Sequence, residues 1–214
     1  MTVNRVLIWI GLVVGVVGLV TQFVVSMQNY AALGRDIPGS LGSFFSYYTI
    51  LTNIVLVLIY LSELVGWRWL EVFRKLDVTG AMVANMILVT TFVHFFLRGL
   101  TVLSGLGVFC DIVLHDVTPL IFVVWWLVAV RHGPLLVRRV PIMLLPTFIY
   151  FLYIMARGAW VQEYPYPVLN VTRLGYGHVL LNAVYLTLGL GALMLLVVGI
   201  DELLGKLRRN PIAA

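Results

Sequence analysis

The chain has few charged residues and a single cysteine, and both shortages exclude whole classes of protein. Charged side chains make up 11% of the 214 residues, whereas water-soluble domains carry about a quarter. Hydrophobic residues make up 62%, so the sequence predicts an integral membrane protein. The net charge of +5 is then expected to face anionic lipid headgroups and not nucleic acid. Cys110, being alone, excludes an internal disulfide and a CxxC redox pair.

The chain also lacks the alternating apolar pattern of a membrane barrel and any linker that could separate domains. Its continuous apolar runs predict an all-α, polytopic bundle of six transmembrane helices, and residues 1–214 form a single domain. The first run is too long for a cleavable signal. The expected spans are residues 6–27, 43–64, 79–97, 111–130, 141–156 and 175–199.

Basic residues predict how these spans are oriented. Of the 14 Lys and Arg residues, ten fall in the N-terminus, the second and fourth loops and the C-terminal tail. The other four are Arg35, Arg98, Arg157 and Arg173. The positive-inside rule therefore predicts a multi-pass protein of the cell membrane with both termini in the cytoplasm.

Polar side chains gather in the half of the predicted bilayer away from the termini. Asp111, His115 and Asp116 begin the fourth span, where ionisable groups are costly and therefore indicate a functional site. Other spans bring Thr49, Asn53, His94, Arg98, His178 and Asn182 to a similar depth. Several are four residues apart, on one face of a helix. We therefore expect one polar pocket that opens toward the outer leaflet.

Two loops give further expectations. His132 lies in a basic loop on the side of the termini and is expected to be solvated. Tyr164–Pro167 reads Tyr-Pro-Tyr-Pro, which favours an extended backbone with aromatic rings at the membrane surface. That segment is either a lid over the pocket or a rigid connection, and periodicity does not separate the two.

Three segments together resemble a known family. FFSYYTILTN (Phe44–Asn53), LHDVTP (Leu114–Pro119) and YPYPVLN (Tyr164–Asn170) are similar to the bacterial Pr-six-Pr six-span membrane proteins. That family is distantly similar to the eukaryotic androgen-induced and androgen-dependent membrane proteins, which hydrolyse lipid esters within the membrane.

The resemblance implies a threonine nucleophile at Thr49 and a histidine at His115. The chain departs from the eukaryotic pattern by a shorter spacing between His115 and Pro119, and by Asp116 in place of a hydroxyl residue. A threonine hydroxyl needs a base within hydrogen-bonding reach, which His115 would supply. Either Asp111 or Asp116 would orient the imidazole. Asn53 or Arg98 would donate to the developing oxyanion.

Two other classes of function remain open on the sequence. His94, His115 and His178 would lie at one level on three helices and could ligate a haem or a metal ion. Alternatively, the pocket would bind or transport lipid without chemistry, or the protein would be structural. The hydrolase hypothesis requires no cofactor, and its expected partners are membrane lipids, including an ester substrate, and not nucleic acid.

Overall fold

The computed structural model describes residues 2–100 and 102–209, and all regular structure in those residues is helical. The α-helices are α1 (Val3–Ala32), α2 (Ile37–Phe44), α3 (Tyr48–Leu64), α4 (Leu76–Phe92), α5 (Leu106–Ile112), α6 (Thr118–Ala129), α7 (Val140–Val161) and α8 (Val171–Arg209). Two π-helical turns are η2 (Val93–Leu97), which ends α4, and η3 (Val113–Val117), which joins α5 to α6. The 3-10 turns are η1 (Arg68–Arg74), η4 (Val137–Arg139) and η5 (Pro167–Leu169).

Five helical runs in the described residues are long and apolar enough to cross a membrane. They are α1, α4 with η2, α5 through α6, α7 with η4, and α8. The helices α2 and α3 pass the same test only as a pair, and they meet at 74°. The prediction of an all-α fold is confirmed for the described residues, and the helices that could span a membrane number 5, or up to 6 if the bent pair is one span.

A capping side chain sets where α2 begins. The Asp36 carboxylate accepts a hydrogen bond from the Gly39 N–H at 3.0 Å, and Pro38 follows in the first turn. A capping carboxylate with an early proline is a strong start signal for a new helix. The chain therefore begins a separate helix before the predicted start at residue 43.

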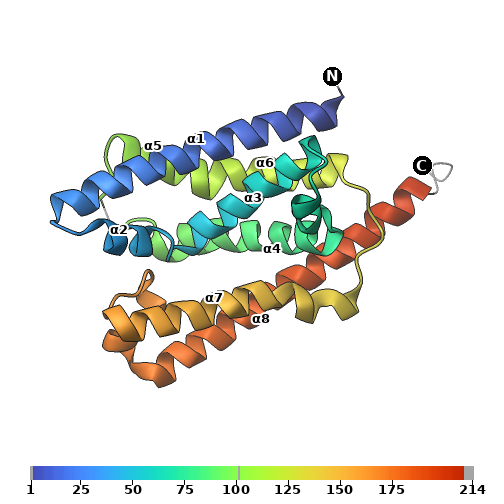
Figure 1. The fold of residues 1–214 in the computed structure, drawn as a ribbon. Coiled ribbons are helices and arrows are strands. Elements are labelled where there is room, and N and C mark those ends of the chain that lie inside the picture. The colour runs from blue at the N-terminus through green and yellow to red at the C-terminus, as the bar shows by residue number, and fades with distance from the viewer. Residues whose placement is uncertain (1, 101, 210–214) are drawn as a thin grey trace.

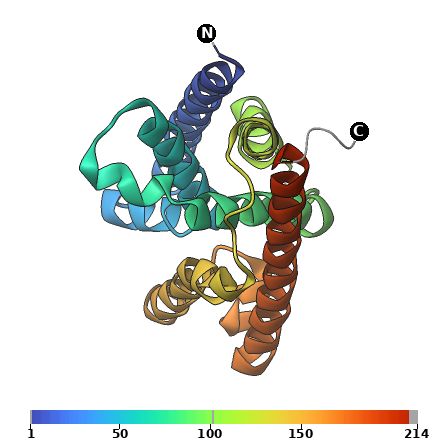
Figure 2. The same cartoon turned by 90° about the vertical axis from the view of Figure 1, so that its right-hand side faces the viewer.

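The helices form a bundle whose two ends differ. α1, α3, α4 and the α5–α6 run pack together, and the α7–α8 hairpin lies along α4 (Figures 1 and 2). α1 begins and α8 ends at one end, here called the terminal end (Figure 1). The α1–α2 and α7–α8 connections lie at the other, distal end. Large buried side chains, among them Tyr60, Phe122, Trp125 and Trp126, form the main core of the bundle.

Glycines bring α1 close to its neighbours. Gly11, Gly15 and Gly18 share one buried face of α1. A β-carbon at Gly15 would lie 2.8 Å from Val57 on α3, and one at Gly18 would lie 2.7 Å from Val113 in η3. Small residues at this spacing allow membrane helices to approach closely. Gly18 therefore determines how near α1 lies to η3.

The structure corrects the expectation that His132 is solvated. Its side chain is 0% exposed and its Nδ1 lies 3.0 Å from Asp201 Oδ1. The other oxygen of Asp201 accepts the backbone N–H groups of Gly133 and Leu135, each at 2.9 Å. Buried groups of this kind are costly when unpaired. This network therefore fixes the α6–α7 connection against the end of α8.

Helix α8 is the longest in the described residues. It has 39 residues, interrupted near its start by Gly175, whose φ of 74° lies in the left-handed region. Only glycine adopts that conformation without strain. The residues before Gly175 pack with the α7–α8 connection, and the remainder runs obliquely past α4 to the terminal end (Figure 1).

We expect Gly11→Leu to destabilise the protein, because a β-carbon there would overlap the ring of Tyr60, which is 1% exposed. Overpacking of this kind costs about 1–3 kcal/mol. Val13→Leu places the same side chain on a 53% exposed position of α1 and should change stability by less than about 0.5 kcal/mol. Thermal unfolding in detergent micelles compares the two variants. Equal melting temperatures would show that the α1–α3 contact does not require glycine.

Candidate functional site

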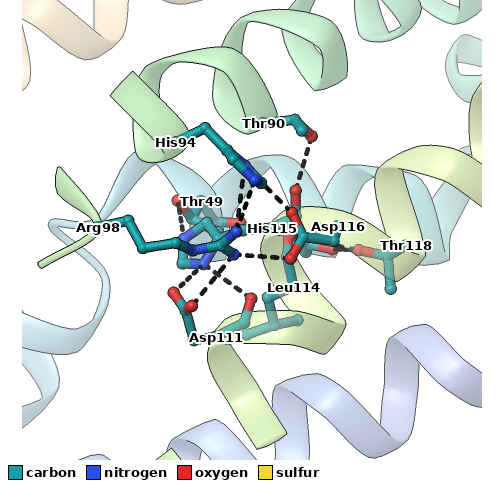
Figure 3. A network of polar contacts seen from close by, with 10 residues as sticks. Thr49, Thr90, His94, Arg98, Asp111, Leu114, His115, Asp116 and Thr118 are labelled. Atoms are coloured by element: carbon teal, nitrogen blue, oxygen red, sulfur yellow. Dashed lines mark hydrogen bonds and ion pairs between the residues drawn. The ribbon is translucent and has the colours of Figure 1, made fainter. Parts of the chain in front are cut away.

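A cluster of polar side chains from three helical runs meets where α3 begins (Figure 3). α3 contributes residues of its first two turns, α4 contributes η2 and the residue after it, and the α5–α6 run contributes the end of α5 and η3. The members predicted from the sequence that the structure brings together are Thr49, Asn53, His94, Arg98, Asp111, His115 and Asp116.

Pro119 explains the local shape of the helix around His115. Proline has no N–H, so the carbonyl of His115, four residues earlier, has no donor within the helix. The helix widens there into η3. The Thr90 hydroxyl donates to the His115 carbonyl at 2.6 Å, and the Asn53 amide donates to the Leu114 carbonyl at 3.2 Å. Side chains of α3 and α4 thus replace helix hydrogen bonds and hold His115 between them.

His115 bridges a hydroxyl and a carboxylate. Its Nε2 lies 3.2 Å from Thr49 Oγ1, and its Nδ1 lies 2.9 Å from Asp111 Oδ1 and 3.0 Å from the Asp111 carbonyl oxygen. Because both neighbours of Nδ1 are acceptors, Nδ1 carries the proton and Nε2 is left to accept one from Thr49. This order of hydroxyl, imidazole and carboxylate allows the imidazole to act as a general base toward an alcohol nucleophile.

Arg98 joins the two carboxylates of the cluster. Its Nη2 donates to Asp116 Oδ2 at 2.6 Å and to Asp111 Oδ2 at 3.2 Å, and its Nη1 lies 2.8 Å from His94 Nε2 (Figure 3). The hydrogen bond to Asp116 raises the pKa of the Arg98 guanidinium above its ordinary value. Arg98 therefore stays charged, and it holds the Asp111 carboxylate in place beside His115.

The structure leaves His178 and Asn182 outside the cluster, contrary to the prediction. His178 is exposed, and its Nδ1 donates to the Leu174 carbonyl on its own helix at 3.1 Å. Asn182 donates to the Val168 carbonyl at 2.8 Å and so braces the α7–α8 connection. The cause is that the start of α8 packs on that connection and on α7, and not on η3.

Asn53 belongs to the cluster but not in the predicted role of an oxyanion donor. Its amide donates to the carbonyls of Thr49, at 2.9 Å, and Leu114, and its side-chain oxygen accepts from the Thr118 hydroxyl at 2.5 Å. Asn53 is 0% exposed. With both amide hydrogens used and no exposure, it positions Thr49 and η3 and has no donor left for a ligand.

The α7–α8 connection adds Tyr166, whose part in the site the sequence reasoning missed. Its hydroxyl accepts the Tyr48 N–H at 3.0 Å and lies in hydrogen-bonding reach of Thr49. Burial raises the pKa of Tyr166 to about 12, so the phenol keeps its proton at neutral pH and can donate it. The signal in the sequence was its place between Pro165 and Pro167, which fix the backbone on both sides.

An ion-pair network fixes this connection in place. Glu163 pairs with Arg35 and accepts a hydrogen bond from Arg157 at 3.3 Å. Both arginines also donate to the Ser43 hydroxyl, at 2.8 and 3.0 Å. The bond from Arg35 holds the pKa of Glu163 below its ordinary value. Of the two readings of Tyr164–Pro167, the contacts favour a rigid connection over a lid.

A cavity of about 950 Å³ lies beside Thr49 and His115. α1, η2, η3, α5 and the α7–α8 connection surround it, and we call it the polar cavity. The hydrogen-bonding side chains in its wall include Gln22, Ser26, Asn29, Arg98, Asp111, His115, Asn170 and Arg173. Its volume lies within the range of small-molecule sites, about 300–1,000 Å³. The cluster therefore faces a space that can hold a ligand.

The geometry does not favour a metal centre. Among the described residues, no three His, Cys, Asp or Glu side chains are grouped so as to hold a metal ion. His94, Asp111 and Asp116 surround the Arg98 guanidinium, whose charge repels a cation. His178 does not join His94 and His115, so the predicted alternative of a three-histidine site has no support here.

Comparison with known proteins finds no matching family model, curated protein or solved structure.

The Glu163 network predicts a pH dependence of stability. Since the folded-state pKa of Glu163 lies below the ordinary value of 4.5, its stabilisation is complete above that pH and is lost as the pH falls through the lower folded-state value. Glu163→Gln should therefore melt below the wild type at pH 7, by the equivalent of about 1 kcal/mol or less because the pair is partly exposed, and the gap should close toward pH 3.

The matched control is Glu202→Gln, which removes a more exposed ion pair with Lys206 within α8. It should change the melting temperature less than Glu163→Gln does at pH 7. A gap between wild type and Glu163→Gln that stayed constant from pH 7 to pH 3 would contradict the assignment of this carboxylate.

Proposed function

We propose that the protein is an intramembrane hydrolase of lipid esters that uses Thr49 as nucleophile and His115 as general base. One observation carries the proposal: Thr49, His115 and Asp111 form a continuous hydrogen-bonded series of 3.2 and 2.9 Å beside a cavity. The resemblance of three segments to the Pr-six-Pr proteins agrees with this assignment. A purely structural role would not require a hydroxyl aligned with an imidazole acceptor.

In the first half of the reaction, Thr49 is acylated. His115 Nε2 takes the hydroxyl proton of Thr49 as Oγ1 attacks the ester carbonyl carbon, and Asp111 stabilises the imidazolium that forms. When the tetrahedral intermediate collapses, the bond to the alcohol oxygen breaks. His115 then gives its proton to the departing alcohol, which leaves an acyl ester on Thr49.

In the second half, water releases the acyl group. His115 removes a proton from water as the water oxygen attacks the acyl carbonyl carbon. Collapse of this intermediate returns the proton to Thr49 Oγ1 and frees a carboxylic acid. His115 acts as base and then as acid in each half, so the cycle requires no external cofactor.

Tyr166 is the best-placed donor for the oxyanion of both intermediates. Its hydroxyl lies next to Thr49 and keeps its proton at neutral pH. The hydrogen bond from the Tyr48 N–H, at the positive end of α3, makes that hydroxyl a better donor. Arg98 lines the same cavity and supplies a fixed positive charge nearby. Donors held in place before the reaction are the main source of stabilisation in such sites.

The location of the site follows from the charge distribution. Ten of the 14 basic residues fall at the terminal end by the sequence count, so we infer that this end faces the cytoplasm of a cell-membrane protein. Thr49 then lies in the outer half of the bilayer, where it would meet ester lipids directly from the surrounding leaflet.

Substitution of the series tests the activity. Thr49→Ala, His115→Ala and Asp111→Asn should lower kcat/KM for esters by a factor on the order of 10²–10⁴, because each removes a member of the proton relay. Thr49→Ser keeps a hydroxyl and should retain activity. Purified proteins would be assayed with a panel of lipid esters and with an activity-based hydrolase probe.

His178→Ala is the matched control, since His178 lies outside the cluster, and it should hydrolyse the esters like the wild type. Wild-type hydrolysis or probe labelling that persisted in Thr49→Ala would exclude Thr49 as the nucleophile.

Reporter fusions test the orientation. A green fluorescent protein joined after the tail of the full chain should fluoresce, because its fold forms in the cytoplasm. Alkaline phosphatase at the same position should be inactive, because it requires an oxidising compartment. Active phosphatase on the full-length tail would reverse the inferred orientation and place the site in the inner leaflet.

A further inference from the structure

A second cavity, of about 450 Å³, reaches Thr49 from the opposite side. It lies between α4, α7 and α8, and we call it the apolar cavity. Its wall is made of side chains such as Leu88, Phe92, Leu144, Phe151, Ala183 and Leu190. Four residues line both cavities, namely Thr49, Val93, Leu97 and Tyr166. The proposed nucleophile therefore stands at the boundary between a polar and an apolar space.

The few hydroxyl groups in the wall of the apolar cavity already have partners. The Tyr48 hydroxyl bonds with Asn85 and with Thr147. Thr187 donates to the Ala183 carbonyl of its own helix at 2.7 Å, and Tyr150 donates to the Ser46 carbonyl at 2.8 Å. These groups have no need of a polar ligand, so the wall suits a hydrocarbon.

The chemistry of the relay decides which part of an ester enters which cavity. The departing alcohol oxygen must receive its proton from His115. His115 and Asp111 line the polar cavity, and neither lines the apolar cavity. The alcohol must therefore leave on the polar side. Its acyl partner, attached to the same carbonyl carbon at Thr49, is directed to the other side.

Building on the proposed function, we propose that the apolar cavity holds the acyl chain of the substrate and sets its length, while the polar cavity holds a hydrophilic alcohol. The substrate class is then an ester of a single hydrocarbon acyl chain with a polar alcohol. α8 lines the apolar cavity from Leu180 to Leu190, about 15 Å of helix at 1.5 Å per residue. Among its lining residues on α7 and α8, Leu144 and Leu190 lie furthest from the distal end.

Acyl-length profiles test the inference. Wild-type kcat/KM is measured for p-nitrophenyl esters from acetate to palmitate, with one alcohol throughout. The value should rise by about fourfold per added methylene until the cavity is full and then stop rising. Thr187→Phe places a ring inside the cavity, so the chain length at which the rise stops should become shorter. The ratio of long-ester to short-ester kcat/KM should fall at least tenfold.

Leu181→Phe is the matched control, because Leu181 is on the same helix, is 48% exposed and does not line the cavity. Its profile should equal that of the wild type. Hydrolysis by the wild type with an unchanged profile in Thr187→Phe would overturn this inference and leave the proposed function standing. An absence of hydrolysis for every ester would overturn the proposed function, and the inference with it.

Discussion

Backbone carbonyls that lose their helix partners cannot turn to water inside a bilayer, and this constraint organises the distal half of the bundle. Pro119 removes one donor, and η3 opens the helix before it. Each unsatisfied group in hydrocarbon would cost several kcal/mol. Donors therefore come from α3, through Asn53, and from α4, through Thr90. These two hydrogen bonds also fix the positions of α3 and α4 relative to η3, and they orient His115 toward Thr49.

Charge balance is the second constraint on this region. Two carboxylates and two imidazoles lie close together, and Arg98 supplies the compensating positive charge. The second oxygen of Asp116 is buried without a hydrogen-bond partner among the described residues, so this carboxylate depends on its ion pair with Arg98. Arg98 is therefore needed to stabilise the folded cluster, whether or not it also takes part in the proposed reaction. Asp111 is at once held by Arg98 and free to orient His115, as a relay carboxylate must be.

Much of the fold was predictable, because hydropathy reports burial in lipid directly. The apolar windows overlap each helical run of the described residues that is long and apolar enough to span a membrane. They could not show that α2 bends away from α3, because hydropathy carries no direction. The Asp36 cap and Pro38 indicate only where α2 begins. His132 was wrongly expected in water because its partner, Asp201, is distant in sequence and only tertiary packing brings the two together.

For the site, the sequence identified most of the side chains that the structure brings together but not their contacts. The spacing of four residues between Asp111 and His115 sufficed to pair them. Spacing could not choose between Asp111 and Asp116 as the partner of the imidazole, since that depends on where Arg98 lies. The same method overestimated His178 and Asn182, which share the predicted depth but face another part of the bundle. The position of a residue along its helix can be predicted from the local sequence, whereas the direction in which its side chain points depends on how whole helices pack.

The length of α8 has a consequence for the membrane that surrounds the protein. The uninterrupted part after Gly175, residues 176–209, corresponds to roughly 51 Å of helix, well above the hydrocarbon thickness of about 30 Å. Such a helix accommodates the mismatch by tilting or by extending past the headgroups, and the degree of tilt depends on bilayer thickness. α8 also forms one wall of the apolar cavity. A change in the tilt of α8 therefore changes the shape of this cavity, so the thickness of the surrounding membrane affects the space available to a ligand.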